Sequence, residues 1–341
     1  MKILVTGGLG YIGAHTSVLL IEQGHQVIIL DNLENSSLRV LDGIASITNQ
    51  RPLFYQTDLR DRKAVVEIFN KHTDIDGVIH FAAYKAVGES VEQPLKYYDN
   101  NINGLIALLE CLIPQEIPLI FSSSCTVYGQ ADRMPIDETS PMKKAASPYG
   151  YTKQIGENII QDCALANSSF KAILLRYFNP IGAHATAQIG ETPNGEPQNL
   201  IPYLTQAVAG KRTELRIFGD DYDTPDGTCI RDYIHVMDLA AAHLESLLYL
   251  HEGKNSSACE CFNVGTGKGN SVLEVVKTFE KSTQKKVPYS IVARRPGDIV
   301  QAYADTHKIE KAMGWKAQYS LAEALQSAWK WEVHSAHLEA Q

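Results

Sequence analysis

Tyr149 and Lys153 are four residues apart, a spacing that puts two side chains over the same turn on one face of a helix. Ser147-Pro148 just before them is a typical helix start. A free tyrosine has a pKa near 10, so using it as a base at pH 7 takes roughly 4 kcal/mol of electrostatic help. A nearby ammonium gives help of the right sign. The pair therefore indicates a general base that removes a proton from a hydroxyl group.

Ser124 is the third residue whose type and place suit this chemistry. It follows the strand-like run Leu119–Ser123, and parallel sheets present ligand-binding side chains at such strand ends. A hydroxyl there can bridge a substrate oxygen and a tyrosine as a short proton relay. A Tyr-x-x-x-Lys pair alone is more often a helix-surface pair, but this serine and the nucleotide-binding pattern below favour catalysis.

The N-terminal residues follow the order strand, glycine turn, helix, strand, acid. The apolar run Ile3–Val5 leads into a turn with Gly7, Gly10 and Gly13, and a second apolar run ends at Asp31. A strand that feeds a helix through a tight turn aims the free N–H groups and positive dipole end of the helix at one point, which suits a pyrophosphate. Gly7 allows the turn, Gly10 lets a pyrophosphate approach the backbone, and Gly13 lets the helix lie close to the sheet.

Asp31 is expected at the end of the second strand, where its carboxylate can bind both hydroxyls of an adenosine ribose. A 2′-phosphate there would meet a negative charge, so the pattern predicts NAD rather than NADP. Glycines at this spacing also occur in ordinary turns. The flanking strands, the helix and the terminal acid therefore carry the prediction.

Strand-like and helix-length segments alternate after this unit, which predicts an α/β fold with a doubly wound parallel (Rossmann) sheet. The expected strands are Pro52–Gln56, Gly77–Phe81, Leu119–Ser123 and Ala172–Arg176, and the expected helices between them are Lys63–Lys71, Leu95–Cys111 and Tyr149–Ala166. Polar residues follow the strands, so the ligands are expected beyond the carboxyl edge of the sheet.

The composition changes after residue 180. Residues 180–232 are rich in Pro, Gly and Asn, with one clear helix at Leu200–Ala209, and a helix at Val236–His251 and a strand at Phe262–Val264 return to the first unit. We therefore predict an NAD-binding domain over residues 1–180 with a return around 233–265. Residues 181–341 are predicted to form a smaller mixed α/β substrate-binding domain, completed by the helix Ser271–Lys281 and the C-terminal helices.

Charge and composition limit the partners. The net charge is −8 with no long basic run, which disfavours nucleic acid. The chain begins with a strand-like run, and no run reaches the eighteen or so apolar residues that span a bilayer. The six cysteines include no C-x-x-C, so reduced thiols are expected. Together these features predict a cytoplasmic protein that binds neither nucleic acid nor membrane.

No metal site is predicted. Asp221, Asp223, Asp226 and Gly227 have a passing likeness to a calcium loop, but Pro225 occupies the fifth loop position and the glycine comes one residue late. The eleven histidines have no ligand spacing. Of the cysteines, Cys125 is next to Ser124, and alternation along a strand would point its side chain to the opposite face, into the core.

Further motifs give the chain a resemblance to a known family. They are Val5–Gly13, Asp31-Asn32, His80-Phe81-Ala82-Ala83, residues 85–90, Tyr98-Asp99-Asn100-Asn101, Phe121–Ser124, residues 126–129, Ser147–Gly150, Leu175–Pro180, Arg231–Asp238 and Arg294-Arg295-Pro296-Gly297-Asp298. With these blocks the chain resembles the UDP-hexose 4-epimerases of the extended short-chain dehydrogenase/reductase family, nearly from end to end.

The resemblance implies a tightly held NAD that oxidises C4 of a UDP-hexose and then returns the hydride to the other face of the 4-keto sugar. The residues it implies for NAD are Gly7, Gly10, Tyr11, Ile12, Gly13, Asp31, Asn32, Asp58, Leu59, Phe81, Ala82, Lys85, Asn100, Ser124, Tyr149, Lys153 and Phe178. Those it implies for the UDP-sugar are Lys85, Ser124, Tyr149, Asn179, Asn199, Leu200, Phe218, Arg231, Tyr233, Arg295, Asp298 and Ala302.

The assignment of Arg231 and Arg295 to the UDP-sugar has physical support. A diphosphate is well matched by guanidinium groups, and Arg231 and Arg295 lie in otherwise polar, glycine-containing surroundings.

In the epimerase family the position of Ala302 belongs to the pocket around the C2 substituent, where a small residue accompanies activity on N-acetylated sugars. Ala302 therefore implies activity on UDP-N-acetylglucosamine and UDP-N-acetylgalactosamine too, unless Tyr303 fills that wall.

Three further functions are compatible with the sequence. A nucleotide-sugar 4,6-dehydratase commonly has an Asp-Glu pair after the strand-tip hydroxyl residue, where this chain has Cys125-Thr126. A simple NAD-dependent dehydrogenase is the second, and a non-catalytic NAD sensor is a more remote third, because sensors typically lack the Tyr-Lys pair. The family pairs into a homodimer through the faces that the helices Leu95–Cys111 and Tyr149–Ala166 would occupy.

Overall fold

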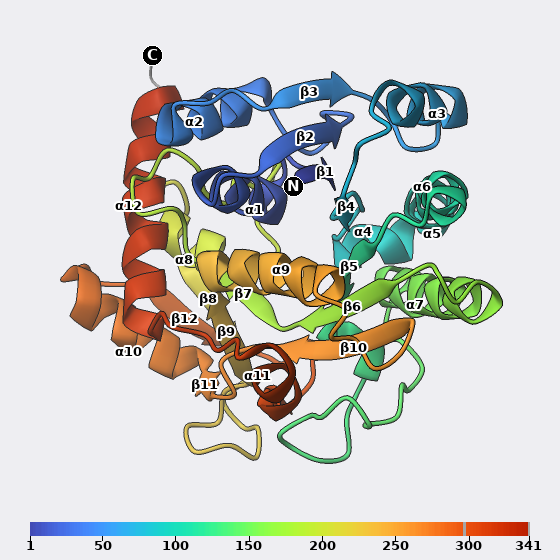
Figure 1. Ribbon diagram of the computed structural model, residues 1–341. Coiled ribbons are helices and arrows are strands. Elements are labelled where there is room, and N and C mark those ends of the chain that lie inside the picture. The colour runs from blue at the N-terminus through green and yellow to red at the C-terminus, as the bar shows by residue number, and fades with distance from the viewer. Residues whose placement is uncertain (296–297, 340–341) are drawn as a thin grey trace.

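A seven-stranded, all-parallel sheet forms the centre of the protein in the computed structural model, which describes residues 1–295 and 298–339. The strand order is β10-β6-β5-β4-β1-β2-β3, and Figure 1 shows the strands stacked from β3 to β10. Their bounds are β1 Lys2–Thr6, β2 Gln26–Asp31, β3 Leu53–Gln56, β4 Gly77–His80, β5 Leu119–Ser124, β6 Ala172–Tyr177 and β10 Cys259–Val264. The predicted doubly wound α/β fold is confirmed.

Helices cover both faces of this sheet (Figure 1). One face carries α1 (Tyr11–Glu22), α2 (Leu38–Thr48), α9 (Val236–His251) and α11 (His307–Met313), and the other carries α3 (Arg62–Lys71), α6 (Gly104–Leu112) and α7 (Pro148–Ala166). Short helices α4 (Val87–Glu92) and α5 (Pro94–Tyr98) precede α6.

The alternation of side chains along each strand explains why both faces are apolar. Ile3 and Val5 of β1 pack into the core cluster beneath α1 and α9, while Leu4 between them packs into the cluster beneath α3, α6 and α7. All three side chains are fully buried, and burying each one contributes about 1.5 to 3 kcal/mol relative to an exposed position. A continuous apolar run is therefore what a strand covered on both faces requires.

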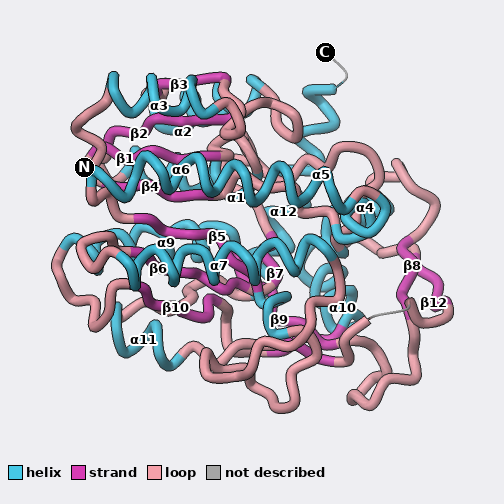
Figure 2. Tube along the Cα trace, turned by 90° about the vertical axis from the view of Figure 1, so that its right-hand side faces the viewer, coloured by secondary structure: helices cyan, strands magenta, loops and turns pink. Residues whose placement is uncertain are grey.

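The predicted helix Leu95–Cys111 is interrupted by a π-helical turn. Asp99–Asn103 forms this turn between α5 and α6, and such turns occur often at functional sites. The turn directs Asn101 inward, where its amide contacts the backbone N and O of Tyr84 and the hydroxyl of Thr152. Figure 2 shows α5 and α6 running alongside α7 on the face toward the viewer.

The second part of the chain contains more strands than the sequence predicts. Its helices are α8 (Leu200–Val208), α10 (Val272–Thr283) and α12 (Leu321–Glu339), and its strands are β7 (Asn179–Ile181), β8 (Leu215–Phe218), β9 (Ile230–His235), β11 (Gly269–Ser271), β12 (Tyr289–Val292) and β13 (Gln301–Ala302). β11, β9 and β13 form a sheet with β7 also paired to β9, and β12 pairs with β8. These strands are too short to show a periodic pattern in the sequence.

The edge strand β10 returns the chain to the first sheet beside β6. The division into domains at residue 180 stays a prediction.

In the described ranges, 1–295 and 298–339, no helix is long and apolar enough to span a membrane.

Candidate active site

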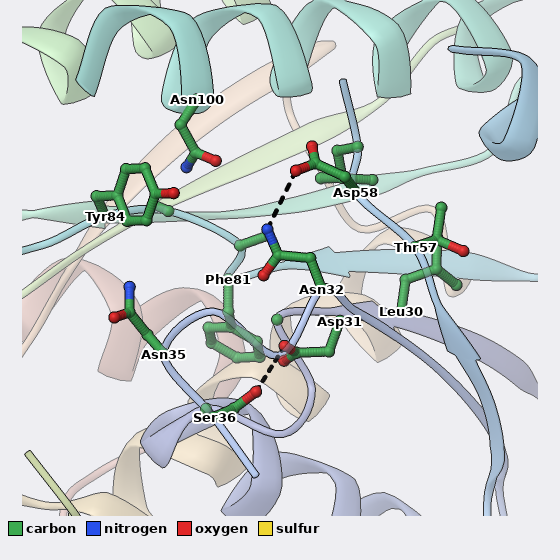
Figure 3. Close-up of a pocket in the computed structure, with 15 residues that line it drawn as sticks. Leu30, Asp31, Asn32, Asn35, Ser36, Thr57, Asp58, Phe81, Tyr84 and Asn100 are labelled. Carbon is green, nitrogen blue, oxygen red and sulfur yellow. Dashed lines mark hydrogen bonds between the residues drawn. The ribbon is translucent and has the colours of Figure 1, made fainter. Parts of the chain in front are cut away.

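A crevice opens at the carboxyl edge of the sheet, where β1, β2, β3 and β4 end (Figure 3). The predicted cofactor residues that line it are Gly7, Gly10, Asp31, Asn32, Asp58, Leu59, Phe81, Ala82 and Asn100. Leu30, Asn35, Ser36, Thr57, Ala83 and Tyr84 line it as well and were not assigned to a ligand from the sequence. Leu30, Thr57, Ala83 and Tyr84 are adjacent in the chain to residues that were assigned, and Asn35 and Ser36 follow Asn32 by three and four residues.

Close backbone contacts hold the glycine turn in place. Gly7 has a φ of +65°, which favours glycine, and a Cβ on it would lie 2.7 Å from the backbone N of Ala82 after β4. A Cβ on Gly13 would lie 2.3 Å from the carbonyl oxygen of Gly7. Gly10 precedes α1 and makes no side-chain cap, so the first N–H groups of α1 are left for a ligand. This arrangement fits a pyrophosphate.

Asp31 is buried and oriented by three hydrogen bonds. Its Oδ2 accepts from the backbone N of Leu9 at 3.1 Å, and its Oδ1 accepts from the backbone N of Leu33 at 2.9 Å and from Ser36 Oγ at 2.7 Å. Figure 3 shows the contact with Ser36. A carboxylate fixed this way at the end of β2 fits a ribose diol, so the residues present fit the adenosine half of NAD.

Asp58 lies across the crevice from Asp31 and contacts Asn32, whose Nδ2 donates to Asp58 Oδ2 at 3.2 Å (Figure 3). Hydrogen bonds from the Arg60 guanidinium lower the pKa of Asp58 to about 2, so this carboxyl group is ionised at neutral pH. Asn100, from the π-helical turn, donates to Asn101 Oδ1 at 2.9 Å.

Ser124, Tyr149 and Lys153 meet at the tip of β5. Lys153 Nζ donates to the carbonyl oxygen of Ser122 at 2.6 Å and lies 5.0 Å from the centre of the Phe121 ring, which ties α7 to β5. The side chain of Tyr149 forms a hydrogen bond with Ser124. The structure therefore brings the three predicted catalytic side chains together, and their catalytic role stays a prediction.

Burial controls the charge of these groups. It raises the pKa of Tyr149 to about 12 against the smaller effect of the Ser124 bond, and it lowers the pKa of Lys153 to about 8 against the opposing charge of Glu157. At pH 7 ionising a phenol of pKa 12 costs roughly 7 kcal/mol. The phenol is thus neutral by itself, and a cation beside it is needed to make it a base.

A buried polar network supports this end of the site. Ser123 Oγ donates to Glu157, and Arg176 Nη2 donates to the same carboxylate at 2.6 Å with both side chains buried. Arg176 Nη1 also donates to Tyr128, whose hydroxyl donates to Asn263 Oδ1 at 2.7 Å. Because an unpaired buried charge is costly, this network holds β5, β6, β10 and α7 in one arrangement.

Cys125 does not lie where strand alternation predicts. It begins a short 3₁₀ turn, Cys125–Tyr128, rather than continuing β5 in extended form. Its half-buried side chain hydrogen-bonds with Ser124 and is close enough to Tyr149 to raise the pKa of that phenol. Alternation holds only while the backbone stays extended, so the thiol is not on the face opposite Ser124, although it does pack against the apolar cluster that contains Val127 and Phe178.

Three of the predicted UDP contacts form one group. The guanidinium of Arg295 lies 4.8 Å from the centre of the Phe218 ring, and its Nη2 is 2.9 Å from Asp298 Oδ1. Pro296 and Gly297 of the same motif lie outside the described residues.

A second group lies on β9 and its partners. Asn179 on β7 is paired with Tyr233, and Arg231 is paired with Ala302 on β13. Arg231 Nη1 donates to its neighbouring carbonyl oxygen at Ile230, 2.8 Å away. Through these pairings β7 and β13 both lie against β9. The role of these residues in binding UDP stays a prediction.

The remaining predicted residues have other partners. Lys85 and Asn199 both contact Glu191, which the sequence did not single out, and Leu200 begins α8. Tyr11 donates to the carbonyl oxygen of Gly182 at 2.6 Å. Predicted cofactor residues Ile12 and Phe178 pack in core clusters.

Two acids of the loop before β9, Asp221 and Asp226, have protein partners. Asp226 accepts from Thr228 and Ser271, and Asp221 pairs with Arg294 at 2.6 Å. Among the residues that the structure describes, no three His, Cys, Asp or Glu side chains are placed to hold a metal ion.

The parallel sheet with its glycine turn and its Ser, Tyr and Lys side chains is the arrangement of the extended short-chain dehydrogenases/reductases, and a family profile described as GDP-mannose 4,6 dehydratase matches residues 4–328. UDP-glucose 4-epimerase of Yersinia enterocolitica is 48% identical over 333 residues, 97% of each chain. The chain belongs to the UDP-glucose 4-epimerase family.

Solved structures agree with this assignment. The Stenotrophomonas maltophila UDP-glucose 4-epimerase, with bound NAD and formylated UDP-arabinopyranose, has a TM-score of 0.96 and 46% identity over 99% of each chain. The UDP-Glc/GlcNAc 4-epimerase of Campylobacter jejuni has a TM-score of 0.84 and 37% identity, covering 98% of this chain and 99% of that chain.

If Tyr149 is the base, as the sequence predicts, replacing it by Phe is expected to lower kcat for UDP-galactose by at least a hundredfold, because phenylalanine has no hydroxyl to exchange the proton. The affinity for UDP, measured by calorimetry, is expected to change less than about threefold. A variant that keeps more than a tenth of the wild-type turnover would show that Tyr149 is not the base.

Proposed function

We propose that this protein interconverts UDP-glucose and UDP-galactose by inverting C4 of the sugar with NAD bound throughout. The observation that carries the proposal is the meeting of Ser124, Tyr149 and Lys153 at the tip of β5. Phe81 and Ala82, which follow the neighbouring strand β4, line the crevice. The proposed base at the tip of β5 and the proposed ribose-binding acid at the end of β2 therefore belong to the same edge of the sheet.

NAD supplies a hydride acceptor that becomes a hydride donor within the same catalytic cycle. Tyr149 removes the proton of the C4 hydroxyl, with Ser124 bridging, as the hydride leaves C4. The 4-keto sugar then turns over, the hydride returns to its other face, and Tyr149 gives the proton back to the C4 oxygen. Electrons and protons balance within one cycle, so no net oxidation occurs.

The pKa values fit this sequence of steps. Tyr149 needs a positive charge beside it before it can act as a base, and an oxidised nicotinamide ring provides one. Lys153 Nζ is fixed on the carbonyl oxygen of Ser122. Proton removal is thereby linked to the oxidised state of the cofactor, which is the state that can accept the hydride.

The site favours epimerisation over dehydration. A 4,6-dehydratase needs an acid to protonate the departing C6 hydroxyl, and here Cys125 follows Ser124. Burial raises the pKa of the Cys125 thiol to about 12, so it is a very weak acid. This observation argues against a dehydratase.

The proposed function is tested by incubating the purified protein with UDP-galactose and no added NAD. Many turnovers per protein molecule are expected, with UDP-glucose as the product, because each hydride returns to the sugar from which it came. Product formation that stops after one equivalent, or that requires added NAD in every cycle, would contradict the proposal and favour a dehydrogenase.

We further propose that the sugar pocket admits an acetamido group at C2. Ala302 is 7% exposed and lies in a cluster with Phe178 and Ala304, and β13 places it beside Arg231. The ring of Tyr303 lies against Gly269, where a Cβ would be 3.1 Å from it. The Tyr303 ring therefore packs against Gly269 of β11. This supports a pocket wall that is formed by the small side chain of Ala302.

Asp232 holds this wall rigid. Its buried carboxylate accepts hydrogen bonds from Ala304 N, Thr266 N and Oγ, and Gly267 N, at distances of 2.6 to 3.2 Å. One of these four bonds holds the backbone N of Ala304, two residues after Ala302, and so restrains the segment that carries Ala302. Because close-packed walls yield little, the size of residue 302 should decide which sugars enter.

Ala302→Tyr is therefore expected to abolish conversion of UDP-N-acetylglucosamine to UDP-N-acetylgalactosamine, since the phenol ring would overlap the acetamido group. Turnover of UDP-galactose by the same variant serves as the internal control and should fall less than about tenfold. The measurement is the equilibrium yield of each sugar nucleotide. No conversion by the wild type, or equal conversion by both proteins, would contradict the proposal.

We also propose a homodimer. Val87, Val91 and Leu95 on α4 and α5 and Tyr151 on α7 are large apolar side chains that are 49%, 61%, 80% and 49% exposed. They occur on adjoining helices, and an exposed apolar face of this kind favours association. Sedimentation equilibrium is expected to give twice the chain mass of 37.7 kDa, and a monomer at micromolar concentration would contradict the proposal.

A further inference from the structure

Glu191 joins Lys85, which is assigned to both NAD and the UDP-sugar, to Asn199, which is assigned to the UDP-sugar alone. Lys85 Nζ lies 2.9 Å from Glu191 Oε1, and Asn199 Nδ2 donates to the same oxygen at 3.0 Å. Lys85 comes from the loop after β4, on the cofactor side, while Asn199 precedes α8 on the UDP side. The side chain of Glu191 is 12% exposed, so the carboxylate lies inside the junction between the two predicted sites.

The backbone on either side of this carboxylate is anchored. Ile189 is 2% exposed and belongs to the core cluster beneath α1 and α2. Gly190 lies under Trp331 of α12, where a Cβ would be 2.2 Å from the indole ring. Trp331 Nε1 donates to the carbonyl oxygen of Glu191 at 3.0 Å. Glu191 is thus presented from a fixed point, as a residue that orients others must be.

The negative charge of Glu191 explains how it can order the Lys85 side chain. Lys85 is a long side chain that is 58% exposed, and ordering it costs rotamer entropy unless a partner holds it. A carboxylate beside two anionic ligands would repel them if its charge were not matched. The ammonium of Lys85 matches that charge, and the bond from Asn199 fixes the amide at the same time.

The same segment also reaches the adenosine end of the crevice. Asn194 Nδ2 donates to the carbonyl oxygen of Glu34 at 3.3 Å and to Asn35 Oδ1 at 3.4 Å. Asn35 lines the crevice (Figure 3). The stretch from Ile189 to Asn199 therefore contacts the cofactor crevice at Asn35, contacts Lys85 through Glu191, and ends at the predicted UDP site.

We propose that Glu191 is a positioning residue that holds Lys85 and Asn199 together, so that retention of NAD and binding of UDP depend on the same carboxylate. The proposal rests on the proposed function for the identity of the two ligands. Glu191 acts through its two partners rather than on the reacting atoms, so its loss should affect binding more than turnover.

The test compares Glu191→Ala with Glu196→Ala in the full-length, NAD-loaded protein. Glu196 is in the same loop and its carboxylate, 63% exposed, pairs with Arg212 at 3.4 Å, so both variants lose one negative charge. Glu191→Ala is expected to raise the Kd for UDP about five- to tenfold by calorimetry and to lower the fraction of NAD retained after gel filtration. For Glu196→Ala both quantities should stay within about twofold of wild type.

Two further readouts separate positioning from folding. Glu191→Ala should raise KM for UDP-galactose about five- to tenfold while kcat changes less than about threefold, and Glu191→Gln should recover part of the UDP affinity because its amide oxygen still accepts from Asn199. In a double-mutant cycle with Lys85→Met, the loss of NAD retention in the double variant should equal that of the worse single variant.

Three results would overturn the proposal. They are a lowered melting temperature with unchanged UDP affinity and NAD retention, additive losses in the cycle with Lys85→Met, and equal effects of Glu191→Ala and Glu196→Ala. The proposed function and the positioning role of Glu191 can be contradicted independently of each other. If UDP binding depends on Glu191 but the wild-type protein interconverts no sugar, the proposed function is wrong and the positioning role stands.

Discussion

The close approach of Gly13 to Gly7 is the constraint on which the site depends. A Cβ at Gly13 would lie 2.3 Å from the Gly7 carbonyl oxygen, and a Cβ at Gly7 would lie 2.7 Å from the Ala82 backbone N. Only glycine lets β1, α1 and the end of β4 come this close. As a result the uncapped start of α1 faces the crevice between Asp31 and Phe81. The positions of the other ligand-binding side chains follow from this edge of the sheet.

Burial keeps the Tyr149 phenol protonated at the tip of β5. Tyr149, with a pKa of about 12, is neutral at pH 7. Lys153, whose pKa burial lowers to about 8, is tied to the carbonyl oxygen of Ser122. The buried Glu157–Arg176 pair links α7 to β6, and Ser123 ties the same carboxylate to β5. In the proposed function, oxidised NAD supplies the positive charge that such a phenol needs to act as a base.

Much of the fold could be predicted because the strands of the central sheet are continuous apolar runs. The spacing of Tyr149 and Lys153 and the place of Ser124 followed from the same reasoning. The strands β7 to β9 and β11 to β13 were not predicted, because strands of two to six residues in a loop-rich segment are defined by distant partners rather than by their own pattern. The π-helical turn at Asp99–Asn103 was missed for a similar reason, since one extra residue per turn leaves little trace in the sequence.

Side-chain contacts between distant segments were the least predictable part of the site. Glu191 lies 106 residues from Lys85 in the chain, and nothing around it marks it as a partner. Cys125 was placed in the core by strand alternation, but the backbone had already left the strand at that residue. In both cases the deciding geometry belongs to the assembled fold.

The central claim is that each hydride removed from C4 returns to the same sugar. It is tested most directly with UDP-galactose that carries deuterium at C4, incubated with the purified protein and followed by mass spectrometry and NMR of the UDP-glucose formed. The account predicts that the deuterium remains at C4 of the product. Deuterium lost to solvent, or found in a released nicotinamide cofactor, would contradict it.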